Sequence, residues 1–275
     1  MAKPPALVQY AVAHPGHPAF YTEAGSGEAV LLIHGSLCDY RYWRWQMPQI
    51  SKSYRVIAPS LRGCWPQAYQ QADSGYSVAT HTQDLVELVK ELSPGRPVHV
   101  LGHSRGAQVA LNFVLEAPDL CRTLTLADPG FRFDHEPPWE VFYAPAVALL
   151  ERHQVEPALE QFIDTVNGAG TWHKMVSWFK DMVRANAYTL VSQIHESNLA
   201  VSLDAVRTID CPVLLISGAD SPKRYGTRQT QLEHALRDVR HVTIKQAAHG
   251  MNLANPRAFN RYCLEFFSTK QIAEV

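Results

Sequence analysis

Hydrophobic residues along the chain form short apolar runs separated by segments with helical spacing. The runs are rich in Val, Ile and Leu and end in Gly, Pro or Asp; they lie at 29–35, 55–59, 98–103, 123–129, 212–218 and 241–245. Consecutive apolar positions are typical of parallel strands that are buried on both faces. Between two runs, the segment 79–92 places four apolar residues on one helical face: Leu85, Leu88, Val89 and Leu92. This alternation predicts a doubly wound α/β sheet with helices on both faces.

Two segments depart from the alternation. The first thirty residues alternate around Pro15 and Gly16, a pattern that predicts an antiparallel edge hairpin. Residues 131–205 show consecutive helical patterns and no convincing strand. We expect these helices to form a cap, because ligands of open α/β sheets bind outside the carboxyl ends of the strands; ordinary packing helices of a second domain are the alternative. The predicted domains are a core, 1–130 and 206–275, and a cap, 131–205, inserted after the sixth strand.

Composition and charge narrow the class of protein. The 275 residues carry a formal net charge of -1, which does not favour nucleic acid or an anionic membrane as a partner. Five widely spaced cysteines indicate neither a disulfide framework nor a zinc site. No apolar stretch approaches the roughly 18 residues of a membrane span, and the start of the chain has no signal-peptide pattern. We therefore expect a cytoplasmic protein with a small-molecule substrate, and homo-oligomer formation stays open.

The stretch "GHSRG" at 102–106 places Ser104 between two glycines where a predicted strand becomes a helix. A serine hydroxyl is a poor nucleophile unless geometry exposes it and a base lies beside it. A tight strand-to-helix turn exposes the hydroxyl, and it requires small residues such as Gly102 and Gly106 around it. Ser104 is therefore the candidate nucleophile.

A base and an acid that orients it are expected at the ends of later strands. His249 follows the last predicted strand in "KQAAHGMN", and Asp220 follows the strand before it in "LLISGADSP". Asp128, in "LADPG", also ends a strand and is the alternative acid. The pattern favours Asp220 over Asp128.

Two backbone N–H groups are expected to form an oxyanion hole. Gly35 follows an early strand and allows the loop to turn the Ser36 N–H toward the nucleophile, while the Arg105 N–H begins the helix after Ser104. His34 is expected to brace this loop.

In this order, the motifs resemble the α/β-hydrolase superfamily over nearly the full chain: His34-Gly35, "SLRG" at 60–63, "GHSRG", a helical insertion after "LADPG", then Asp220 and His249. The resemblance implies an eight-stranded, mostly parallel sheet with a helical lid and a triad of Ser104, His249 and Asp220. Relatives often carry Asp at the position of Ser60 and a small residue near Trp65, so Trp65 is expected to intrude on the pocket. Relatives with an aspartate nucleophile, the haloalkane dehalogenases and epoxide hydrolases, are disfavoured by Ser104.

The predicted function is hydrolysis of a carboxylic ester or lactone through an acyl-enzyme on Ser104, with no metal or organic cofactor. Aromatic residues of the cap favour a small, largely apolar or aromatic substrate. The candidate substrate contacts are Trp139, Phe142, Trp172, Trp178 and His195.

Three other functions remain open at this stage. A cofactor-independent dioxygenase of an N-heteroaromatic substrate would use His249 and its acid to deprotonate the substrate; "CDYRYW" at 38–43 and the missing Asp at Ser60 are compatible with it. A carbon-carbon bond hydrolase of ring-cleavage products would share the same site. A non-catalytic receptor on this fold is disfavoured by the intact triad pattern.

Overall fold

The computed structural model describes residues 9–14, 17–69 and 75–269. Eight strands form one sheet in the order β1-β2-β4-β3-β5-β6-β9-β10. Their bounds are β1 Gln9–His14, β2 His17–Ala24, β3 Ala29–Ile33, β4 Arg55–Pro59, β5 Val98–His103, β6 Cys121–Ala127, β9 Val213–Gly218 and β10 Val239–Ile244. The predicted eight-stranded sheet is confirmed.

The first two strands are the antiparallel part of the sheet. β1 pairs with β2 and β2 with β4 in antiparallel register, while the six strands from β4 to β10 pair in parallel. The predicted edge hairpin is therefore confirmed, although its turn at 15–16 lies outside the described residues. The other strands begin and end within two residues of the predicted bounds.

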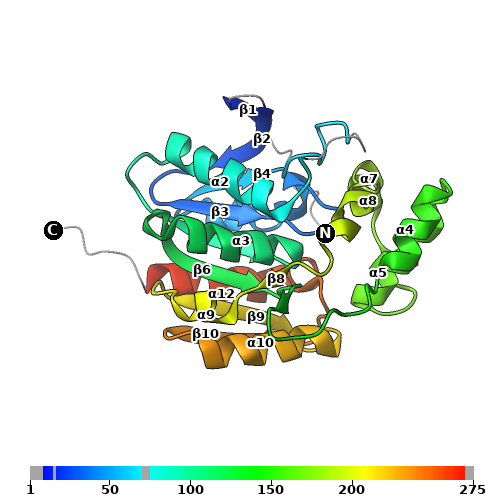
Figure 1. Ribbon diagram of the computed structural model, residues 1–275. Coiled ribbons are helices and arrows are strands. Elements are labelled where there is room, and N and C mark those ends of the chain that lie inside the picture. The colour runs from blue at the N-terminus through cyan, green and yellow to red at the C-terminus, as the bar shows by residue number, and fades with distance from the viewer. Residues whose placement is uncertain (1–8, 15–16, 70–74, 270–275) are drawn as a thin grey trace.

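Helices cover both faces of the sheet (Figure 1). Alternate residues of β3 point to opposite faces: Val30 and Leu32 belong to one apolar core, Leu31 and Ile33 to the other. The first core is closed by α1 (Met47–Ile50) and α12 (Pro256–Ser268), the second by α2 (Val78–Leu92), α3 (Arg105–Glu116) and α10 (Lys223–Ala235). This two-sided burial explains why the parallel strands have continuous apolar runs.

The segment 131–205, called the insert below, joins β6 to the β9 side of the sheet. Its helices α4, α5, α7 and α8 lie on one side of the molecule in Figure 1, whereas α9, which begins at the end of the insert, lies apart from them beside the core. The bounds are α4 Ala144–Glu151, α5 Val155–Asn167, α6 Thr171–Lys174, α7 Ser177–Ala185, α8 Thr189–Gln193 and α9 Leu203–Arg207. The expectation that the insert contains no strand is wrong in one detail, because β7 (Arg132–Phe133) and β8 (Ala200–Val201) form a short parallel pair. Two-residue strands are too short for a periodic signal, and the division into core and cap domains stays a prediction.

The remaining helical elements are single turns. They are α11 (Met251–Ala254) and three 3₁₀ turns, η1 Tyr40–Trp43, η2 Pro118–Leu120 and η3 Ile194–Glu196. Within the described ranges, no helix is long and apolar enough to cross a membrane.

A buried polar cluster ties the insert to the sheet. Asn186, between α7 and α8, donates from Nδ2 to Asp39 Oδ2 at 2.7 Å and accepts the Trp65 N–H at 2.8 Å. Asp39 also accepts two hydrogen bonds from the Arg41 guanidinium, which stacks on the Trp65 ring at 3.9 Å. Asp39 and Asn186 are fully buried, and removing one member would leave the others unsatisfied. The stretch "CDYRYW" thus has a structural role.

One expectation about the loop after β4 needs correction. Trp65 does not intrude on the pocket: it packs against Arg41 and Tyr40, with ring centroids of Tyr40 and Trp65 5.5 Å apart, and lines neither cavity described below. Ser60 accepts the Tyr40 N–H on its Oγ at 3.2 Å. A short hydroxyl therefore satisfies the backbone where relatives often carry a carboxylate.

Candidate active site

Ser104 occupies a strained turn between β5 and α3. Its φ of 57° and ψ of -122° lie in a region that residues with a side chain rarely adopt. β5 ends at His103 and α3 begins at Arg105, so the serine is the single residue of the junction. Such a turn holds the hydroxyl out of the sheet beside the free N–H groups of the first helical turn.

The glycines around Ser104 are required by backbone contacts. A Cβ on Gly102 would lie 2.3 Å from the carbonyl oxygen of Gly106, and one on Gly106 would lie 2.3 Å from the carbonyl oxygen of His34. A Cβ on Gly35 would lie 3.0 Å from the Ser104 Cβ. The loop after β3 therefore packs directly against the candidate nucleophile.

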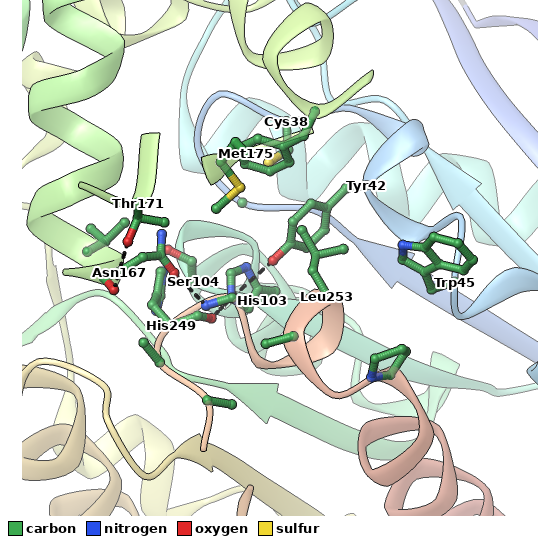
Figure 2. A pocket seen from close by; sticks show the side chains of 18 of the residues that line it. Cys38, Tyr42, Trp45, His103, Ser104, Asn167, Thr171, Met175, His249 and Leu253 are labelled. Carbon is green, nitrogen blue, oxygen red and sulfur yellow. Dashed lines mark hydrogen bonds between the residues drawn. The ribbon is translucent and has the colours of Figure 1, made fainter. Parts of the chain in front are cut away.

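His249 lies in the loop after β10 and is held on several sides (Figure 2). The Tyr225 ring stacks on its imidazole with centroids 4.2 Å apart, and the His103 ring lies 4.6 Å away. His103 Nε2 donates to the His249 carbonyl oxygen at 2.8 Å, and Asn167 of the insert accepts the Gly250 N–H at 2.9 Å. These contacts set both the loop and the ring orientation.

The structure pairs His249 with Asp128. The preference for Asp220 as the acid beside His249 is therefore wrong. His249 Nδ1 lies 3.2 Å from Asp128 Oδ2. The Asp128 side chain is fully buried, and it also accepts hydrogen bonds from Ser221 Oγ at 2.5 Å and from Gln229 at 3.4 Å. Asp220 is exposed, and within the described chain it has no hydrogen bond or ion pair with His249.

The physical reason is the position of two neighbouring strands. β6 and β9 pair in parallel, so their carboxyl ends reach the same edge of the sheet and either can place an acid there. Asp128 directly follows β6. At the end of β9, a Cβ on Gly218 would lie 2.4 Å from the Ala248 carbonyl oxygen, so the two backbones touch there. Asp220 falls beyond this contact, exposed at the edge of the larger cavity.

Burial controls the charges of this pair. It lowers the pKa of His249 to about 3, with a smaller contribution from the positive charge of Arg224. It raises the pKa of Asp128 to about 6, against the opposing effect of the Ser221 hydrogen bond. At pH 7 the site therefore holds a neutral imidazole beside an ionised carboxylate, which is the state a general base requires.

The residues of the predicted oxyanion hole lie beside Ser104. Ser36 lines the same two cavities as Ser104, and Arg105 begins α3. The Arg105 guanidinium is occupied elsewhere, donating to Glu196 at 2.9 Å and to His81 Nδ1 at 3.0 Å. His34 accepts the Leu61 N–H on Nε2 at 2.9 Å. This hydrogen bond joins the loop after β3 to the loop after β4, in agreement with the expectation that His34 braces the first of these loops. The role of the two N–H groups stays a prediction.

Two cavities meet at Ser104. The larger, of about 1260 Å³, runs from Ser104 and His249 between the insert and α11–α12, with Trp178 among its lining residues (Figure 2). The smaller, of about 60 Å³, is lined by Trp139, Phe142, Arg224 and Tyr225, among others.

The predicted substrate contacts divide accordingly. Trp178 lines the larger cavity, and Trp139 and Phe142 line the smaller. Trp172 lines neither; it is 3% exposed and packs beneath Lys180. His195 is exposed and also lines neither. Helical spacing could not separate these cases, because the packing of the insert decides which face of each helix meets the site.

Several residues of the site had no assigned role in the sequence analysis. Tyr225 and Arg224 lie in the first turn of α10, and Asn167 ends α5. None follows a strand or belongs to a motif, so no local signal marks them. His103 had such a signal, since it directly precedes Ser104.

Comparisons with known proteins agree with this architecture. A family model described as "Alpha/beta hydrolase family" matches residues 30–262. The (E)-2-((N-methylformamido)methylene)succinate hydrolase of Acinetobacter baylyi is 25% identical over 244 residues, which are 88% of this chain and 91% of that protein.

Two solved structures show the same fold. The epoxide hydrolase CorEH superposes with a TM-score of 0.80 at 22% identity, over 97% of this chain and 100% of that one. The enol-lactonase of Burkholderia xenovorans LB400 superposes with a TM-score of 0.79 at 18% identity, over 94% and 100% of the two chains.

Proposed function

Because the chain belongs to the alpha/beta hydrolase family, we propose that it hydrolyses a carboxylic ester or lactone through an acyl-enzyme on Ser104. The observation that carries the proposal is a strained, half-buried serine and a neutral histidine that line the same cavity, with a buried carboxylate behind the histidine. The similarity to a hydrolase of a substituted succinate supports hydrolytic chemistry. The apolar lining of the larger cavity supports a largely apolar or aromatic group in the substrate.

In this mechanism His249 removes the Ser104 proton and the serine oxygen attacks the carbonyl carbon. The Ser36 and Arg105 N–H groups stabilise the oxyanion, and Asp128 holds the imidazole with Nδ1 protonated. His249 then gives the proton to the leaving alkoxide, and the alcohol departs. A water molecule, deprotonated by His249, attacks the acyl carbon; the acid leaves and Ser104 regains its proton.

No observation favours the dioxygenase. The two features that were compatible with it, "CDYRYW" and Ser60, are accounted for by the Asp39–Asn186 cluster and by the Tyr40 N–H. Carbon-carbon bond hydrolysis would use the same residues, and turnover of a ring-cleavage product would distinguish it from ester hydrolysis.

The proposal is tested with p-nitrophenyl acetate, p-nitrophenyl butyrate and a δ-lactone on the purified protein. We expect Ser104→Ala to lower kcat by on the order of 10⁴- to 10⁶-fold, because the covalent route is lost. The matched control is Ser36→Ala, which keeps the backbone N–H and should change kcat by less than about tenfold.

A fluorophosphonate probe supplies an independent readout. Intact mass spectrometry should show one adduct on the wild-type chain and none on Ser104→Ala. Turnover that survives in Ser104→Ala would disprove the acyl-enzyme proposal.

A further inference from the structure

Arg224 lies in the small cavity beside the candidate nucleophile. It occupies the first turn of α10, next to Tyr225, whose ring stacks on His249. Its guanidinium lies over the Phe142 ring at 4.1 Å and over the Tyr225 ring at 4.9 Å. Aromatic faces attract a cation but do not neutralise its charge.

The guanidinium of Arg224 has no acidic partner among the described residues. Its hydrogen bonds to protein run to neutral groups, from Nη2 to the Thr165 carbonyl oxygen at a long 3.5 Å and to the Tyr225 side chain, and its Nε is buried without a partner. The other guanidinium in this cavity, Arg105, is paired with Glu196 at 2.9 Å. One turn after Arg224 on α10, Arg228 is paired with Glu136 at 2.6 Å. Arg224 as a whole is half-buried, but its Nε is fully buried; because buried charged groups are normally paired, we expect an anionic partner from outside the chain.

The Nε–Nη2 edge of Arg224 has the geometry that binds a carboxylate. Nε and Nη2 lie on the same side of a guanidinium and donate two parallel hydrogen bonds. In this chain the same two atoms of Arg55 donate to both oxygens of Glu23, each at 2.9 Å. A carboxylate that meets Arg224 in this way would satisfy both donors, with the Phe142 ring against the face of the guanidinium.

Charge and size of the small cavity agree with such a ligand. Its charged lining residues are Arg105, Glu196 and Arg224, and because the first two pair with each other, one positive charge is in excess. At about 60 Å³, the small cavity takes a small group such as a carboxylate, whereas a long apolar chain requires the larger cavity of about 1260 Å³.

We propose that the substrate carries a carboxylate group a few atoms from the scissile carbonyl and that Arg224 binds it in the small cavity while the apolar remainder occupies the larger one. This inference rests on the proposed ester or lactone hydrolysis, whose substrate it restricts to anionic acids. Ser104 lines both cavities and so stands at their junction, where the scissile bond must lie.

The test compares matched neutral and anionic esters. In one pair the charge is on the acyl side: 4-nitrophenyl hexanoate and mono-(4-nitrophenyl) adipate. In the other it is on the leaving group: phenyl acetate and 4-acetoxybenzoate. We expect the wild-type protein to prefer the anionic member of at least one pair in kcat/KM.

Arg224→Met should lower the anionic-to-neutral ratio of kcat/KM by about 30-fold or more, the usual effect of removing one partner of a buried charge pair. Arg224→Lys keeps the charge without the two-pronged geometry and should recover part of the ratio. The matched control is Lys223→Met, which removes an exposed cation from the same turn and should leave the ratio unchanged within about twofold. Equal ratios in wild type, Arg224→Met and Lys223→Met would overturn the inference.

A binding measurement separates this inference from the proposed function. Adipate should raise the Tm of Ser104→Ala and of the wild type, and it should raise the Tm of Arg224→Met much less. If neutral esters are hydrolysed through Ser104 but adipate has the same effect on all variants, the carboxylate inference fails alone. If no ester is hydrolysed while adipate binding still depends on Arg224, the hydrolytic proposal fails and the anion site stands.

Discussion

At the scale of single residues, the environment of His249 and Asp128 determines what each can do. A histidine in water has a pKa near 6.5 and is partly charged at neutral pH. Burial between Tyr225 and His103 keeps the imidazole neutral, and the adjacent Asp128 carboxylate fixes which nitrogen carries the proton. Asp220 has no such contact, because it lies on the surface beyond the end of β9.

The first prediction concerns these two acids. Asp128→Asn should lower kcat for ester hydrolysis by about 10⁴-fold, because an amide at this position favours the wrong imidazole tautomer. Asp220→Asn is the matched control and should change kcat by less than about fivefold. Steady-state kinetics on p-nitrophenyl butyrate measures both. If Asp220→Asn is the more damaging of the two, the pairing seen in the structure is not the catalytic one.

At the scale of elements, packing explains the glycines in the turn from β5 to α3. The sequence motif predicted small residues at Gly102 and Gly106. In the structure, the backbone of α3 and the end of β3 lie where a Cβ on these residues would go. The elements that hold the insert were less predictable. Asn186 and Asn167 are ordinary polar residues in the sequence, and only the docked insert brings them to Asp39 and to the His249 loop.

The second prediction tests this close packing. Gly106→Ala should lower the free energy of unfolding by about 3 kcal/mol or more, because its Cβ would press on main-chain carbonyl oxygens that cannot rotate away. Gly226→Ala on α10 is the matched control: its Cβ would meet nothing within 4 Å, so it should stabilise the helix by up to about 1 kcal/mol. Urea unfolding followed by circular dichroism compares them, and equal effects of the two substitutions would contradict the packing argument.

At the scale of the whole molecule, burial of neutral histidines couples folding to pH. The pKa of five histidines is lowered, in each case chiefly by burial: His34, His81, His99, His103 and His249. A group whose pKa is lower in the folded state stabilises the fold above its unfolded pKa, here about 6.5, and loses this contribution as the pH falls. The raised pKa of Asp128 acts in the opposite direction, but it is a single group.

The third prediction is that acid destabilises the fold. Between pH 7.5 and pH 5, each of the five histidines should lower the free energy of unfolding by about 2 kcal/mol. Their sum is comparable with the 5–15 kcal/mol that typically stabilises a domain. The free energy of unfolding should therefore fall steeply between pH 6.5 and pH 4, with uptake of several protons. Urea titrations at pH 7.5, 6 and 5 measure it. Stability that does not change over this range would mean that these histidines are already charged in the folded protein.

The sequence by itself predicted a doubly wound sheet with alternating strands and helices, an edge hairpin, and the candidates Ser104 and His249. These follow from local patterns: apolar runs buried on two faces, a glycine-flanked turn, and residues placed directly after strands. Only the tertiary structure decided that Asp128 rather than Asp220 meets His249, that Trp178 lines the large cavity while Trp172 is buried, and that Arg224 has no acidic partner among the described residues. Each of these depends on which side chains meet across elements distant in the chain. Two neighbouring strand ends can supply the same carboxylate, and only the packing of their side chains selects between them.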